Sequence, residues 1–349
     1  MGEQIMKQIV KQSVGLDVSK DTVAACFSQQ EIGKPFRVLS SKTFSIHALG
    51  FQKLHAWIEK QHVKTVTLHL LMEATGVYYE ELAYFLNNAQ YRVTVLLPNK
   101  THAYAKSLDY KSKNDKIDAK KLAQMSLERE LPQWSPPSDI MLKIKHLCRE
   151  RDELLREKVA FKNRLHAKTY AHAPEHNTLK RAQEALEFLE QQILEIEKEI
   201  KDAVAIDPQI KEKMDNVCSI PGVAITTAAV IVSEANGFNL FKNKAQLVSY
   251  AGYDVPQEQS GSSIDKKRGI SKKGNHHMRK ALYFPALAAI RCNPHLNNLY
   301  QRIFDTTKIK MKGYVAIQRK LLVLIYTIYK NNIAFDPQFL AVQNNDLSQ

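Results

Sequence analysis

The central part of this chain constrains its fold more than any other part. From Leu179 to Ala203, apolar residues recur at alternating intervals of three and four positions, and residues 136–206 contain no glycine. A repeat of this kind is typical of a long helix that packs on a partner helix in a coiled coil. The seam consists of Leu179, Ala182, Leu186, Leu189, Ile193, Ile196, Ile200 and Ala203.

A weaker apolar seam precedes this one, and the segment His172–Asn177, which contains Pro174, separates the two. We therefore predict an antiparallel helical hairpin over residues 136–210, either packed on itself or shared between subunits. Such an arm acts as a spacer or a dimerisation element. The seam itself indicates only that a partner helix exists, so it does not establish a homo-oligomer or choose between a dimer and a tetramer. The weaker seam consists of Leu147, Leu154, Phe161 and Leu165.

The residues before the arm, 1–135, read as strands that alternate with helices. In Ser13–Ser19, every second residue is apolar, which is the period of a strand. Strands interleaved with helices indicate an α/β domain. The predicted strands are Ser13–Ser19, Phe36–Leu39, Thr43–Phe44, Val63–Met72 and Tyr91–Leu97, and the predicted helices are Ile46–Glu59 and Asp115–Arg129.

After the arm, we predict a third, mainly helical domain over residues 211–332, followed by a polar tail over 333–349. Val217–Glu234 has a Pro-Gly turn ahead of a helix of small residues, as in helix-hairpin-helix modules. The backbone N–H groups of such a turn can approach a phosphate closely, although the turn is also common in purely structural positions. A further helix is predicted over Asn275–Ile290.

Composition predicts a cytoplasmic protein without a membrane partner. The longest apolar runs, Ala281–Ile290 and Leu321–Tyr329, are too short to cross a bilayer. The four cysteines are scattered without a CxxC pair, which favours a reducing compartment over a zinc or disulfide framework. The first residues lack the apolar stretch of a secretory signal.

The net charge of +14 is concentrated in one segment. Residues Ser260–Lys320 hold 14 lysines and arginines against two acids, Asp265 and Asp305. A surface of this kind attracts polyanions, and nucleic acid is the expected partner because contacts to phosphates release condensed counterions. The alternative is a solvated basic face without a ligand. The predicted nucleic-acid contacts are Lys266, Lys267, Arg268, Lys272, Lys273 and Arg279.

Four acidic residues of the first domain predict a metal site. Asp17 lies within a strand, where aspartate is disfavoured, and Glu73 ends a second strand. Asp115 and Asp118 are three residues apart at the start of a helix and so share a face. Clustered carboxylates need a cation, and oxygen ligands favour Mg²⁺ or Mn²⁺. Two such ions are a common arrangement for phosphodiester chemistry.

Each acid also has a simpler interpretation. Asp115 is equally well explained as a helix cap or first-turn acid, and Glu73 as a solvent-facing strand end. Asp17 is harder to explain in this way, because Gly15 and the following Ser19-Lys20-Asp21 mark a tight turn at the end of its strand. As a set, the four acids indicate an RNase H-like nuclease site.

The chain resembles the DEDD-type insertion-sequence transposases over almost its whole length. Residues 15–20 (GLDVSK), 72–78 (MEATGVY) and 113–123 (KNDKIDAKKLA) resemble their N-terminal domain, and residues 219–234, 247–261 and 266–282 resemble their C-terminal domain. The resemblance implies a RuvC-like fold with the four acids at Asp17, Glu73, Asp115 and Asp118. It also implies multimers that recombine DNA under the guidance of an element-encoded RNA.

The same resemblance assigns a nucleophilic serine to Ser260, acting on the DNA backbone beside the metal-bound acids. A hydroxyl nucleophile needs activation, and the neighbouring lysines and Arg268 would neutralise the phosphate under attack. The residues alone do not separate Ser260 from Ser262 or Ser263, and a flexible Ser-Gly turn is the alternative. His276 and His277 have no partner at a spacing that would make them a base or metal ligands.

Three functions are consistent with these residues. The first is a transposase or site-specific recombinase with a serine nucleophile beside a divalent-metal site. The second is a RuvC-like nuclease in which metal-activated water attacks, and the third is a nucleic-acid-binding protein without catalysis. A covalent protein–DNA adduct would separate the first from the second. DNA binding without any strand cleavage or exchange would favour the third.

Overall fold

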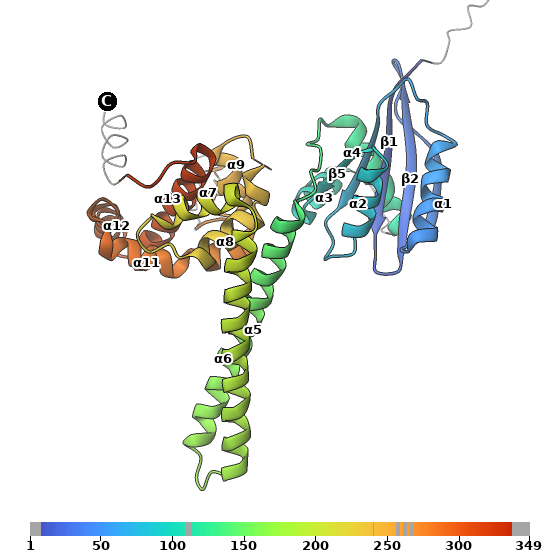
Figure 1. The fold of residues 1–349 in the computed structure, drawn as a ribbon. Coiled ribbons are helices and arrows are strands. Elements are labelled where there is room, and N and C mark those ends of the chain that lie inside the picture. Colours follow the sequence, from blue (N-terminus) through green and yellow to red (C-terminus); the bar gives the residue numbers. More distant parts are fainter. Residues whose placement is uncertain are drawn as a thin grey trace, which may run out of the picture. The chain divides into compact units, whose positions relative to one another are not determined.

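The computed structural model describes residues 8–108, 114–239, 241–255, 259–260, 264–265 and 269–336. The chain divides into two compact units, Met1–Pro136 and Pro137–Gln349 (Figure 1). None of the helices in these described ranges is both long and apolar enough to span a membrane. Each unit has its own core.

The first unit is built on a five-stranded mixed sheet in the order β3-β2-β1-β4-β5. The strands β1, β2 and β3 form an antiparallel meander, and β4 and β5 run parallel to β1. The predicted RuvC/RNase H-like α/β fold is confirmed. The strands are β1 (Ile9–Val18), β2 (Thr22–Glu31), β3 (Arg37–Ser45), β4 (Leu68–Glu73) and β5 (Arg92–Leu96).

Helices cover both faces of this sheet. On one face, Leu16 and Leu70 pack with Leu54 of α1 and Leu86 of α2. On the other face, Leu71 packs with Leu122 of α4. A further short helix, α3, follows β5. The helices are α1 (Ala48–Glu59), α2 (Glu80–Asn88), α3 (Pro98–Ala105) and α4 (Asp115–Glu128).

Several elements of this unit differ from those predicted. The interior strand β2 was not predicted, because it is buried on both faces and lacks a clear alternation of apolar and polar residues. The two short strands Phe36–Leu39 and Thr43–Phe44 form one strand, β3. The helices α2 and α3 were not predicted either.

The second unit begins with the helical arm. Helices α5 (Asp139–Thr169) and α6 (His176–Ala205) pack against each other, so the predicted hairpin packs on itself within one chain (Figure 1). Ion pairs link the helices: Arg151 contacts Glu197 at 2.6 Å, and Lys158 contacts Glu190 at 3.0 Å. The buried seam residues of α6 include Leu189, Ile193, Ile196, Ile200 and Ala203.

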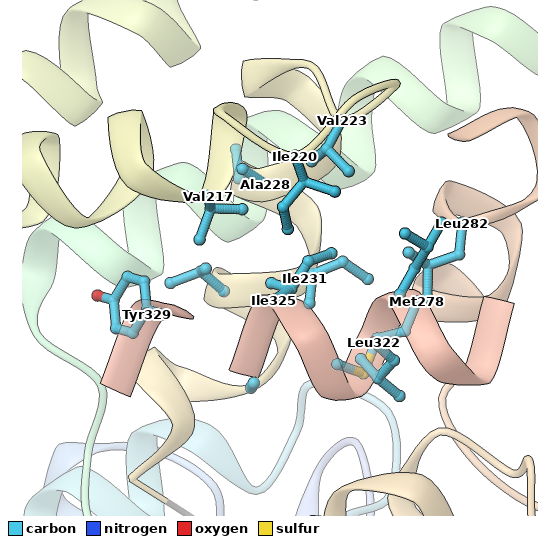
Figure 2. Packing of buried hydrophobic residues seen from close by; sticks show 14 of the residues in the cluster. Val217, Ile220, Val223, Ala228, Ile231, Met278, Leu282, Leu322, Ile325 and Tyr329 are labelled. Atoms are coloured by element: carbon cyan, nitrogen blue, oxygen red, sulfur yellow. The ribbon is translucent and has the colours of Figure 1, made fainter. Parts of the chain in front are cut away.

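The remaining helices share one apolar core with the base of the arm. Ile144 of α5 and Ile200 of α6 belong to the cluster that contains Ile231 and Ile325, and Figure 2 shows Ile231 against Ile325 and Leu322. The predicted boundary at residue 210 therefore does not divide two compact units. The elements are α7 (Pro208–Cys218), α8 (Ile225–Glu234), η1 (Asn236–Phe238), α9 (Lys244–Tyr250), β6 (Gln259–Ser260), β7 (Ile264–Asp265), α10 (His276–Ala281), α11 (Tyr283–Cys292), α12 (Pro294–Thr307) and α13 (Lys310–Asn331).

One prediction for this unit is wrong, and for a second the structure supplies a structural explanation. The single helix expected over Asn275–Ile290 is two helices, α10 and α11, because Pro285 has no N–H group to continue the hydrogen-bond ladder. The Pro-Gly turn between α7 and α8 packs on protein: a β-carbon at Gly222 would lie 2.8 Å from that of Ala288 and 3.1 Å from the carbonyl oxygen of Pro285. Close packing against α11 thus explains this glycine without a phosphate.

Candidate active site

Two of the predicted acids lie at the ends of neighbouring parallel strands. Strands β1 and β4 pair with Leu16 opposite Met72, so Asp17 and Glu73 are the next residues on each strand. Each strand ends within one residue of its acid. Both acidic residues are half-buried. The sheet therefore holds the backbones of Asp17 and Glu73 side by side.

The two carboxylates also share one face of the sheet. Asp17 is paired with Ala24 of β2, which packs against α4. Glu73 is paired with Leu96 of β5, which packs in the cluster formed with α4. Residues paired across neighbouring strands point to the same face of a sheet. Asp17 and Glu73 therefore both lie on the face that α4 covers.

The other two acids lie in the first turn of α4. Asn114 caps this helix, and its Oδ1 accepts a hydrogen bond of 2.9 Å from the backbone N–H of Ile117. Asp115 is thus a first-turn acid rather than the cap. Its side chain is exposed, whereas Asp118 is half-buried.

A close contact between α4 and β1 brings this helix start toward Asp17. A β-carbon at Gly15 would lie 2.0 Å from the carbonyl oxygen of Ala119 and 2.3 Å from the backbone nitrogen of Ala123, so only glycine fits. Gly15 precedes Asp17 by two residues on the same face of the strand, and Ala119 follows Asp118 in the helix. The four acids therefore lie on one side of the sheet, on three elements.

Hydrogen bonds and an ion pair hold two of these carboxylates. Glu73 accepts hydrogen bonds from the hydroxyl of Thr101, in α3, and from Thr75 Oγ1 at 3.3 Å. Lys121 Nζ pairs with Asp118 at 2.8 Å, and only 12% of the lysine side chain is exposed. Within the described ranges, no three His, Cys, Asp or Glu side chains converge closely enough to hold a metal ion. The metal-ligand set stays a prediction.

The predicted nucleophile lies in a separate structure in the second unit. Ser260 belongs to the short strand β6, which pairs with β7 so that Ser260 is opposite Ile264. We call the pair of strands β6 and β7 the serine hairpin. The neighbouring serines, Ser262 and Ser263, lie outside the described residues, so the choice of Ser260 stays a prediction.

The predicted nucleic-acid contacts fall into three groups. Lys272 and Lys273 are exposed beside the serine hairpin. Arg279 is half-buried, and its Nη1 donates hydrogen bonds to the backbone oxygens of Ala251 at 2.7 Å and Asn275 at 3.3 Å, which gives it a structural task. Lys266, Lys267 and Arg268 lie outside the described residues.

Known protein families match segments in both units. Residues 14–171 match a transposase family of the DEDD IS110 type, and residues 214–301 match the transposase IS116/IS110/IS902 family. The chain is also 30% identical over 328 residues to the pilin gene-inverting protein of Moraxella bovis, with 93% of this chain and 98% of that protein aligned.

The chain belongs to the IS110 family of transposases. The pilin gene-inverting protein of Moraxella lacunata is equally similar, at 30% identity over 93% of this chain and 98% of that protein. The transposase for insertion sequence element IS1328 of Yersinia enterocolitica is 25% identical, over 58% of this chain and 65% of its own length. As a member of this family, the chain is a DNA transposase or recombinase.

A solved structure is also similar to part of this IS110-family transposase. It is T. thermophilus RuvC in complex with a Holliday junction substrate, with 14% sequence identity and a TM-score of 0.26. The similarity covers 35% of this chain and 99% of the RuvC chain.

A polar network in the second unit of the transposase was not predicted from the sequence. Glu234 is buried at the end of the apolar helix α8, and Arg149 of α5 contacts both of its carboxylate oxygens, at 2.7 and 3.0 Å. Asn275 donates a hydrogen bond of 2.7 Å to the same carboxylate. The sequence does contain a signal for this network. Glu234 directly follows the largely apolar run ITTAAVIVS, and an acid that continues such a run needs a polar partner if it is buried.

Proposed function

We propose that this transposase cleaves and rejoins DNA through Ser260 as nucleophile, with the carboxylates of the first unit as a divalent-metal site. The observation that carries the proposal is the common placement of Asp17, Glu73, Asp115 and Asp118. These acids come from two strands and one helix and lie on one side of the sheet. A structural role does not require four carboxylates on one side of a sheet, where they repel one another.

The donor set fits Mg²⁺ or Mn²⁺. All four side chains offer carboxylate oxygens, which these ions prefer, and three of the four are half-buried. The bound ion supplies positive charge that stabilises a phosphate as negative charge develops on it. Thr101 orients Glu73 through its hydroxyl, and Lys121 holds Asp118 through its ammonium group.

The proposed covalent step is an exchange of one phosphodiester for another. The Ser260 hydroxyl oxygen forms a bond to phosphorus, and the bond from phosphorus to one strand end breaks. That strand end leaves as a hydroxyl after receiving the equivalent of the serine proton. Because the serine–phosphate ester replaces the DNA ester, a strand-end hydroxyl can attack it and reseal the backbone without an added energy source.

The proposed partners are the DNA of the element ends and target, and an element-encoded guide RNA. Exposed lysines such as Lys272 and Lys273 beside the serine hairpin support a phosphate-binding role. We propose that the active assembly is a dimer or a tetramer. Apolar side chains exposed on the arm, including Phe188 and Leu194, which are 64% and 60% exposed, support such an assembly.

The decisive experiment traps the reaction on a nicked suicide substrate and looks for protein covalently joined to DNA. Wild type is expected to form the adduct and Ser260→Ala to form none, because alanine has no oxygen to attack phosphorus. Ser262→Ala and Ser263→Ala are the matched controls and should keep at least partial activity. An adduct with Ser260→Ala would assign the nucleophile to a neighbour.

The second candidate is a RuvC-like nuclease in which water attacks the phosphate. The same placement of the four acids favours it, since a carboxylate metal site can also activate water. Cleavage by wild type without any adduct on the suicide substrate would identify this mechanism.

A further inference from the structure

The serine hairpin is attached to the helical body by a narrow, hydrogen-bonded stem. The backbone N–H of Ser271 donates to the carbonyl oxygen of Asp254 at 2.7 Å, and that of Lys272 donates to Gly252 at 3.1 Å. The hydroxyl of Ser271 also donates to Asp254 Oδ1 at 2.7 Å. These bonds tie the chain entering the hairpin to the chain leaving it.

Asn275 connects this stem to the helices beneath. Its backbone N–H donates to the carbonyl oxygen of Tyr250 at 2.8 Å, and its side-chain oxygen caps α10 by accepting from Met278 N–H at 3.2 Å. Its Nδ2 donates to Glu234 Oε2 at 2.7 Å. One side chain thus fixes the end of the stem, the start of α10 and a contact to α8.

Glu234 is buried, and its hydrogen-bond partners keep its carboxylate ionised. Only 2% of its side chain is exposed, and Arg149 binds its carboxylate with two hydrogen bonds. Burial alone would raise the pKa of Glu234, but the hydrogen bonds and charge of Arg149, together with Asn275, lower it below the ordinary value. The carboxylate is therefore an ionised, fixed acceptor for the Asn275 amide.

The base of the arm supplies Arg149 and a second contact to the same segment. Asp152, one turn further along α5, pairs with Lys280 of α10 and lies 3.7 Å from Nδ1 of His277. Helix α5 is therefore bonded both to the acceptor of Asn275 and to the helix that follows the stem. These polar contacts link the base of the arm to α8 and α10, the helices that hold the end of the stem.

We propose that Arg149, Glu234 and Asn275 are positioning residues that fix the serine hairpin on the helical body for attack on DNA. The inference rests on the proposed role of Ser260. A hydrophobic pair would stabilise this core equally well or better, whereas only a fixed acceptor can orient the Asn275 amide. The network thus favours one placement of the hairpin stem, and with it one placement of the nucleophile.

The first test is Asn275→Ser, because serine still caps α10 but cannot reach Glu234. We expect the single-turnover rate of adduct formation, at saturating DNA, to fall about 10- to 100-fold, because small displacements of reacting groups have effects of this size. The dissociation constant for DNA should change less than about threefold. Asn243→Ser is the matched control, since Asn243 caps α9 in the same way, through Gln246 N–H at 3.0 Å.

The second test compares two arginines on the same helix. Arg149→Gln is expected to slow adduct formation as Asn275→Ser does, and Arg149→Lys should restore part of the rate by restoring the charge. Arg151→Gln is the control, because Arg151 pairs with Glu197 of α6, which lies within the arm and not at the stem. Equal rate losses for Arg149→Gln and Arg151→Gln would overturn the proposal.

Hydrogen exchange separates this proposal from the role of Ser260. The amides of Ser271 and Lys272 should exchange faster in Asn275→Ser than in wild type or Asn243→Ser, whichever residue is the nucleophile. Unchanged exchange and an unchanged rate would overturn the positioning role and leave Ser260 as nucleophile intact. An adduct formed by Ser260→Ala would instead overturn the proposed function. Mapping the residue that is joined to DNA in the adduct detects this outcome directly.

Discussion

The acidic face of the first unit and the serine hairpin of the second unit are built in opposite ways. The acids lie on regular elements: two strand ends and the first turn of a helix that touches the sheet at Gly15. Ser260 lies in a two-residue strand on a hairpin that is fixed through its stem. The elements that carry the acids are therefore held by packing, and the stem of the hairpin is held by hydrogen bonds.

This difference indicates where each half of the chemistry is vulnerable. A site placed by packing fails when backbone contacts are disturbed, because packed interiors tolerate little change of volume. A site placed by hydrogen bonds fails when one acceptor or donor is lost, even if the fold survives. Four variants, one of them a triple variant, probe the two units, beginning with the largest expected effect.

Asp17→Asn should abolish metal-dependent strand cleavage, with a loss of at least about 100-fold, while the fold remains nearly intact. The amide keeps the volume of the carboxylate and removes its charge. Cleavage of labelled DNA in Mg²⁺, measured beside the thermal unfolding curve, checks this expectation. Full activity of Asp17→Asn would show that this acid is not part of a metal site.

Gly15→Ala should destabilise the first unit by about 3 kcal/mol and remove activity with it. The added β-carbon would lie within 2.3 Å of two backbone atoms of α4, so the helix carrying Asp115 and Asp118 must move. Gly269→Ala is the matched control, because a β-carbon there meets nothing within 4 Å. Chemical denaturation of both variants measures the difference, and equal stabilities would contradict the close contact.

Neutralising Lys266, Lys267 and Arg268 should lower the slope of log affinity against log salt by up to about three, if each contacts a phosphate. Nucleic-acid binding measured from low to high salt gives this slope. A triple variant of exposed arm lysines, Lys162, Lys168 and Lys201, is the control. If only the control changes the slope, the binding surface lies on the arm.

Glu59→Gln should cost the first unit about 1 kcal/mol of stability at neutral pH without affecting cleavage, because the carboxylate is partly exposed and screened. Hydrogen bonds from Lys64 and then Tyr91 lower the pKa of Glu59 to about 2. Its contribution is present above the ordinary pKa of 4.5 and is lost as pH falls toward 2. Unfolding curves at several pH values should show the variant converging on wild type in acid.

Much of the first unit could be predicted from its sequence, because β1 alternates apolar and polar residues and β4, β5, α1 and α4 also carry local signals. Strand β2 could not, since burial on both faces removes the alternation that identifies a strand. The four acids could be singled out as unusual in their elements. Their common face depends on the pairing of β1 with β4 and on the contact at Gly15, which are long-range features that no local pattern contains.

In the second unit, the heptad seam predicted the arm, because helical periodicity is a local signal. The seam did not reveal whether its partner helix came from the same chain, and the structure supplies that answer. The network of Arg149, Glu234 and Asn275 joins residues 41 and 85 positions apart, so no spacing in the sequence points to it. The assignment of Ser260 as nucleophile depends on the family resemblance. The hydrogen bonds of the stem beside it could not be predicted from the sequence.

The shared core of the arm base and the C-terminal helices has a consequence for the order of folding. Contacts between α5 and α6 close a short loop, whereas Asp152 meets Lys280 across 128 residues, and long loops close at a greater entropic cost. We expect pulse-labelled hydrogen exchange during refolding to protect the arm first and the amides of Ser271 and Lys272 last. During synthesis on the ribosome, the first unit would then fold and place its acids before the helices that support the serine hairpin have been made.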